Sequence, residues 1–110
     1  MNDEILKFMV ENAEGWRLVK SKSGATLVRF PNGGKMNINA IKEHSFIYEH
    51  LLTRACEGLG IVIEQTGMTW GYTFRRYYNH GSVKSSDLCA GSTTDEAKEA
   101  ALTAVWEETP

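Results

Sequence analysis

Apolar residues recur three or four positions apart in three stretches of the chain, a spacing that places side chains on one face of an α-helix. This pattern predicts helices over residues 3–13, 40–57 and 93–106. The apolar positions of the second helix are Ile41, Phe46, Ile47, Leu51, Leu52 and Ala55. We expect Asn39 or Ser45 to cap its start. Gly58 and Gly60 are expected to end it, because glycine suits the left-handed position that follows a helix.

The start of the third helix carries a local signal of its own. Thr93 and Glu96 have the spacing of a capping box, in which each side chain accepts from the backbone amide of the other residue. Small residues follow at helical spacing and would let this helix lie close against a sheet. These residues are Ala97, Ala100, Ala101 and Ala104.

The segments between the helices are rich in β-branched and aromatic residues and are separated by glycine-containing turns, which is typical of strands. Strands are expected at residues 16–20, 25–30, 35–39, 61–65, 69–78 and 82–90. The order of elements predicts an α+β fold, in which an antiparallel sheet, made of an N-terminal hairpin and a three-stranded meander, packs with helices. The best-defined part has the order αβββα and covers residues 41–107.

A chain of 110 residues is long enough for one hydrophobic core, so we expect a single domain over residues 1–110. The meander is expected to bury one face under both flanking helices. Trp70, Tyr72 and Phe74 alternate along the longest strand and are expected to form that face.

Composition indicates an ordinary globular protein, with 42% apolar and 24% charged residues. The first residues are acidic and lack a long apolar run, and no stretch approaches the ~20 apolar residues of a membrane span. We therefore expect a cytoplasmic protein. Cys56 and Cys89 lie among apolar residues and are expected to be small buried side chains rather than a disulfide.

Charge is unevenly distributed, although the net charge is only −2. From Arg17 to Lys42 every charged residue is basic. These residues are Arg17, Lys20, Lys22, Arg29, Lys35 and Lys42. Such a patch binds phosphates or an acidic protein surface. Alternatively, it prevents edge-to-edge aggregation of the hairpin, and the sequence favours this second interpretation. The isoelectric point of about 5.9 argues against general nucleic-acid binding.

Two further surfaces are candidates for binding. The end of the long strand combines guanidinium groups with aromatic rings. This combination suits stacking on nucleic-acid bases or contact with another protein, and the protein interface is the favoured interpretation. Its residues are Arg75, Arg76, Tyr77, Tyr78 and His80. The last helix is acidic instead and is a candidate mimic of nucleic acid towards a basic partner. Its residues are Asp95, Glu96, Glu99, Glu107 and Glu108.

Signals of catalysis are missing from the sequence. The histidines, at positions 44, 50 and 80, do not have the spacing of a metal site. Gly58 and Gly60 are not followed by a helix and so do not form a dinucleotide fingerprint. We therefore expect no enzyme activity, no metal and no cofactor.

The region from Ile41 to Trp106 resembles the double-stranded RNA-binding domain, an αβββα unit. The residues that carry the resemblance are the small-residue loop at 90–93, Ala97, Lys98, Ala100 and Ala101. Two lysines that grip phosphate in that family are replaced here by Thr94 and Asp95. The resemblance therefore implies the fold and a single phosphate contact, at Lys98.

Residues 70–78, 82–90 and 93–106 are also similar to small phage proteins with an α-β-α sandwich, in which an aromatic strand, a hairpin and an alanine-rich helix end the chain. This likeness implies an accessory role. The expected function is a non-enzymatic binding protein, phage-encoded, that inhibits a host defence protein by occupying its surface. The alternatives are a nucleic-acid-binding domain of the RNA-binding type and sequestration of a small nucleotide signal. The expected partner is another protein, and a homodimer is allowed.

Overall fold

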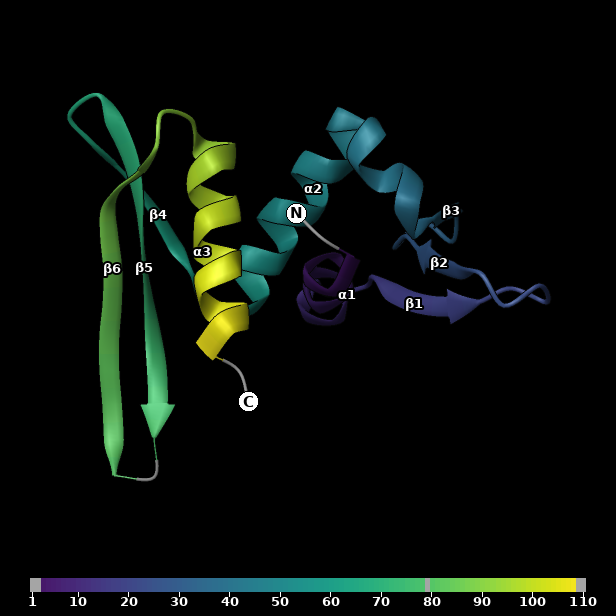
Figure 1. Cartoon of the computed structure of the whole chain (residues 1–110), viewed down its shortest axis with the longest axis horizontal. Coiled ribbons are helices and arrows are strands. Elements are labelled where there is room, and N and C mark those ends of the chain that lie inside the picture. Colours follow the sequence, from purple (N-terminus) through teal and green to yellow (C-terminus); the bar gives the residue numbers. More distant parts are fainter. Residues whose placement is uncertain (1–2, 79, 109–110) are drawn as a thin grey trace.

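Helices stand between two separate antiparallel sheets in the computed structural model, which describes residues 3–78 and 80–108, the side chains of Tyr77 and Tyr78 excepted (Figure 1). The N-terminal sheet has the strands β1 (Arg17–Lys20), β2 (Thr26–Arg29) and β3 (Lys35–Asn37). The C-terminal sheet has the strands β4 (Val62–Thr66), β5 (Thr69–Tyr78) and β6 (Gly81–Gly91). Both sheets follow chain order. The α+β class and all six expected strands are confirmed.

The helices among the described residues are α1 (Asp3–Asn12), the 3-10 helix η1 (Ile38–Glu43), α2 (Ser45–Gly58) and α3 (Thr94–Glu108). The single helix expected over residues 40–57 is therefore divided. His44 interrupts it with a non-helical backbone (φ −107°, ψ 87°). Neither expected cap is present: the Asn37 side chain caps η1 by accepting from the Asn39 amide, and no side chain caps α2.

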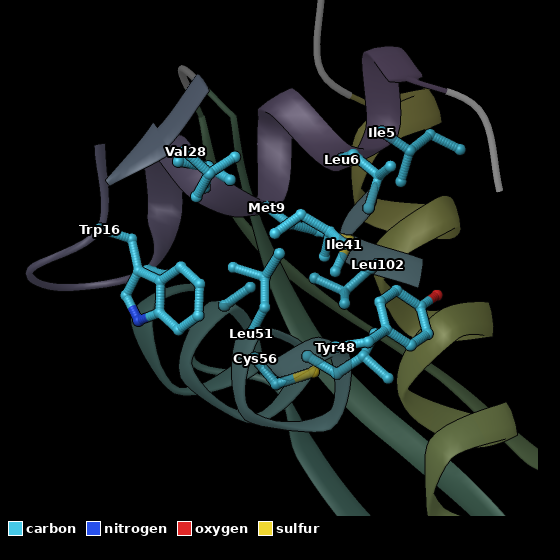
Figure 2. Close-up of a cluster of buried hydrophobic side chains, with 14 of the residues drawn as sticks. Ile5, Leu6, Met9, Trp16, Val28, Ile41, Tyr48, Leu51, Cys56 and Leu102 are labelled. Carbon is cyan, nitrogen blue, oxygen red and sulfur yellow. The ribbon is translucent and has the colours of Figure 1, made fainter. Parts of the chain in front are cut away.

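The hydrophobic core lies where the three α-helices meet (Figure 2). From α2, Leu51 and Leu52 are fully buried between α1 and α3. The N-terminal sheet contributes Val28, which is also fully buried. The buried side chains that α1 and α3 add to this cluster are Ile5, Leu6, Met9, Val10, Ala101 and Leu102. One cluster therefore joins the N-terminal sheet to the helices.

One helix rather than two covers the C-terminal sheet. α3 lies along β5 and β6, while α2 packs on α1 and on α3 (Figure 1). The expectation that both helices cover one sheet face is wrong, because the apolar face of α2 is buried against α1 and α3. Of the aromatic face, Phe74 is buried and stacks on Tyr72 at 5.8 Å between ring centroids. Tyr72 and Trp70 are half-buried.

A bulge bends the C-terminal sheet near Gly71. Trp70 pairs with Gly91 and Tyr72 with Asp87, so residues 88–90 lie opposite Gly71 alone. A Cβ atom on Gly71 would lie 2.4 Å from the Asp87 carbonyl oxygen, so glycine is required there. The bulge leaves Cys89 exposed, which corrects the expectation that this thiol is buried.

The capping box of α3 is present in altered form. Thr93 Oγ1 accepts from the Glu96 amide at 3.2 Å, as expected. The Glu96 carboxylate, however, accepts from the amide of Ser92 at 3.0 Å rather than from that of Thr93. Two amides that precede or begin the helix are therefore still satisfied by side chains.

Gly58 marks the closest approach between α1 and α2. A Cβ atom at this position would lie 1.8 Å from the carbonyl oxygen of Asn12, which is backbone and has little room to move. The C-terminal end of α2 can therefore lie against the end of α1 only without a side chain at position 58.

Gly58→Ala tests this contact. Alanine at an open helical position would add up to about 1 kcal/mol of stability through helix propensity. Here we expect the free energy of unfolding to fall by about 1–3 kcal/mol, the usual cost of overpacking. Urea unfolding measures the change, with Glu49→Ala on the exposed surface of α2 as the control. A Gly58→Ala variant as stable as the parent would show that the helices do not meet this closely.

Candidate binding surfaces

Three cations form one row across the outer face of the N-terminal sheet. Arg17 pairs with Arg29 across β1 and β2, and Arg29 pairs with Lys35 across β2 and β3. Paired residues of antiparallel strands point to the same face. The neighbouring row, formed by Leu18, Val28 and Met36, packs on the core, so the cations face away from it. We call Arg17, Arg29 and Lys35 the cation row; with strands ~4.8 Å apart it spans about 10 Å.

The cation row is electrostatically unfavourable in the isolated protein. Like charges directly opposite each other destabilise a sheet. The ion pairs within the described part of the chain are Glu4–Lys7, Arg54–Glu57 and Arg76–Glu108, and none reaches the row. Protection of a sheet edge does not explain Arg29, because β2 is the central strand.

The other members of the basic segment do not join the row. Lys20 lies on the opposite side of the sheet, where its Nζ donates to Thr26 Oγ1 at 2.9 Å. Lys22 lies in the turn after β1, and Lys42 lies in η1; both are exposed. The structure thus divides the six basic residues and brings three of them together.

The aromatic end of β5 is not a single surface. Arg75 and Arg76 are consecutive in the strand and therefore point to opposite faces. Arg75 Nη1 donates to Ser82 Oγ at 3.0 Å, whereas Arg76 is paired with Glu108 of α3. His80 is exposed. The side chains of Tyr77 and Tyr78 lie outside the described residues.

The acidic side chains of α3 are largely engaged within the fold. Glu96 caps the helix, and Glu108 pairs with Arg76. Glu99 accepts from the Tyr48 hydroxyl at 3.0 Å, and burial together with this carboxylate raises the pKa of Tyr48 well above its usual value. Asp95 is half-buried, and Glu107 is exposed. These contacts weaken the case for a nucleic-acid mimic, because three of the five carboxylates have internal roles.

A groove lined by rings lies between the N-terminal sheet and α2, with a volume of about 360 Å³. Its lining residues are Trp16, Phe30, Pro31, Asn32, Phe46, Ile47 and His50. We call it the aromatic groove. Phe46 is 78% exposed, which corrects its assignment to the buried face of a helix. The sequence offered no signal for this groove, because its rings come from three segments that are distant along the chain.

The two thiols have opposite surroundings, and both are free. Cys56 is buried in the core, and this burial raises the pKa of its thiol to about 12. Cys89 is exposed on the bulge of β6.

No three histidine, cysteine or carboxylate side chains of the described ranges lie together as metal ligands would. Within the same ranges, no helix is both long and apolar enough for a membrane span.

No protein-family model, curated protein or solved structure matches the chain. The likenesses to RNA-binding domains and phage proteins thus remain expectations, and what the structure supports is the small α+β fold. Lys98, the one phosphate contact implied by the RNA-binding likeness, is half-buried and donates to Thr53 Oγ1 of α2 at 3.0 Å.

Alkylation by iodoacetamide distinguishes the exposed thiol from the buried one. At neutral pH we expect Cys89 to react in the native protein and Cys56 to react only after unfolding, because its thiol is buried and stays protonated. Peptide mapping by mass spectrometry locates the label, and Cys89→Ser should abolish native labelling. Equal labelling rates for both thiols in the folded protein would contradict the core position of Cys56.

Proposed function

We propose that this is a non-enzymatic binding protein that engages an acidic surface of another protein through the cation row. The observation that supports the proposal is the alignment of Arg17, Arg29 and Lys35 on one sheet face without a neutralising carboxylate among the described residues. An anionic partner would relieve the repulsion within the row. Binding would therefore remove part of the unfavourable electrostatic free energy that the free protein carries.

A protein partner fits the surroundings of the row better than nucleic acid does. The next cross-strand pairs on the same face place Val19 opposite Leu27 and Leu27 opposite Asn37. Both aliphatic side chains are only half-buried. Apolar groups beside arginines are typical of protein interfaces, whereas a phosphate backbone would leave them unused. The net charge of −2 also argues against general binding of nucleic acid.

The nucleic-acid alternative has weaker support. Thr94 and Asp95 stand where the RNA-binding family has lysines, and Lys98 is already bonded to Thr53. Sequestration of a nucleotide, a phage origin and inhibition of a defence protein stay predictions from the sequence. Inhibition is compatible with the proposal, because a protein that covers a partner's acidic surface blocks whatever else binds there.

Arg29→Gln removes the central cation and should weaken binding to an acidic protein surface about thirtyfold, which corresponds to the roughly 2 kcal/mol of an interface hot spot. A capped polyglutamate peptide is the probe, duplex RNA the competitor, and fluorescence anisotropy the readout at several salt concentrations. Lys42→Gln, which removes an exposed cation outside the row, is the matched control. The proposal is wrong if duplex RNA binds more tightly than the peptide, or if both variants bind the peptide as the parent does.

The same substitution should stabilise the free protein. Removing the middle of three like charges relieves two unfavourable pairs, and we expect the free energy of unfolding to rise by about 0.2–1 kcal/mol. Urea unfolding at low salt measures the gain, which should shrink as salt screens the row. Lys42→Gln should give no comparable gain. A loss of stability in Arg29→Gln would mean that the guanidinium contributes a favourable contact.

A further inference from the structure

We propose that the aromatic groove binds an extended basic peptide of a partner protein, with a proline among the rings and a neighbouring arginine or lysine at the acidic rim. This site is separate from the cation row. It accepts a basic partner segment, whereas the cation row accepts an acidic surface. It rests on three features: the arrangement of the rings, a buried donor without a partner, and the charges beside the groove.

The rings come from three parts of the chain and form a continuous apolar surface. Trp16, between α1 and β1, meets Phe30, after β2, edge to face at 5.2 Å between centroids. His50 of α2 lies 6.3 Å from Trp16 and 6.3 Å from Phe46. Phe46 projects into solvent with 78% of its surface exposed. An apolar occupant would cover this phenyl ring, which the fold leaves uncovered.

Trp16 supplies the polar feature of the groove. Its side chain is 8% exposed, and its indole Nε1, a donor, has no hydrogen-bond partner within the described residues. Buried donors are almost always paired, so an orphaned one calls for an explanation. In Figure 2 the nitrogen lies on the ring edge turned away from the core residues Met9 and Leu51. A carbonyl of a bound peptide would satisfy this N–H after a local rearrangement of the groove wall.

The charges beside the groove select a cation. Two further hollows adjoin it and share His50 with it. Their carboxylates are Glu14, Glu49 and Glu57. Arg54 neutralises Glu57 at 2.8 Å, whereas Glu14 and Glu49 form no ion pair in the part of the chain described. A lysine or arginine of the ligand would meet these acids and could also lie over the rings as a cation–π partner.

An extended proline-containing peptide combines these requirements. Its polyproline conformation exists before binding, so little conformational entropy is lost, and its carbonyls are free to accept. A nucleotide would also stack on the rings, but its phosphates would meet the carboxylates of Glu14 and Glu49. The charge of the rim therefore favours the peptide.

The probe is a capped peptide of alternating proline and arginine, labelled with fluorescein and titrated with the whole protein. We expect saturable binding that is at least about tenfold tighter than for the matched, uncharged proline–glutamine peptide. Phe46→Ala should weaken binding about tenfold at an unchanged melting temperature, because the ring is exposed in the free protein. Trp16→Phe keeps a ring but removes the N–H, and should weaken binding several-fold.

Arg29→Gln is the control that separates this site from the cation row, and it should leave binding of the proline–arginine peptide unchanged. Glu49→Gln should weaken binding and flatten its salt dependence. The proposal is overturned if the proline–arginine peptide does not saturate, if the proline–glutamine peptide binds equally well, or if Phe46→Ala binds like the parent while remaining folded. These outcomes do not bear on the cation row, since none of them measures an acidic ligand.

Discussion

The packing of α2 between α1 and α3 is the interaction on which the rest of the structure depends. The two sheets are separate and lie on opposite sides of the helices (Figure 1). Their relative position is fixed through side chains such as Leu51 and Leu52, which lose all contact with water. The same packing brings the end of α2 against the carbonyl oxygen of Asn12, a contact that only a glycine at position 58 permits.

This arrangement determines which surfaces remain for binding. The N-terminal sheet buries only the face that carries Val28, so the cation row on its other face needs no role in folding. The C-terminal half uses its charges differently. Glu99 holds Tyr48, and Glu108 holds Arg76 across α3 and β5. Several charged residues of this half thus join elements, whereas the cation row is unpaired within the residues described.

Local sequence signals predicted local structure well. Glycine turns and β-branched runs located the six strands, and Thr93 correctly marked the start of α3. The errors concern effects of tertiary structure. His44 interrupts a stretch with helical periodicity, and the bulge opposite Gly71 turns Cys89 outward. Phe46 has the spacing of a core residue, yet α2 buries a different face.

The candidate surfaces were predictable only in part. The run of basic residues was visible in the sequence, but its reduction to Arg17, Arg29 and Lys35 depends on strand register, which spacing along the chain does not reveal. The aromatic groove needs Trp16 and His50 side by side, although they are far apart in sequence. Arg75 and Arg76 are neighbours in one predicted surface, although the alternation of a strand already places their side chains on opposite faces.

The central claim is that the cation row is the surface that meets an acidic partner. Nuclear magnetic resonance of the isotopically labelled protein, titrated with the polyglutamate peptide, tests it most directly, because each backbone amide reports separately. The account predicts saturable shifts confined to β1, β2 and β3 and centred on Arg29, with α3 and the end of β5 unchanged. Shifts centred instead on Arg75 and His80, or spread evenly over every exposed lysine and arginine, would contradict it.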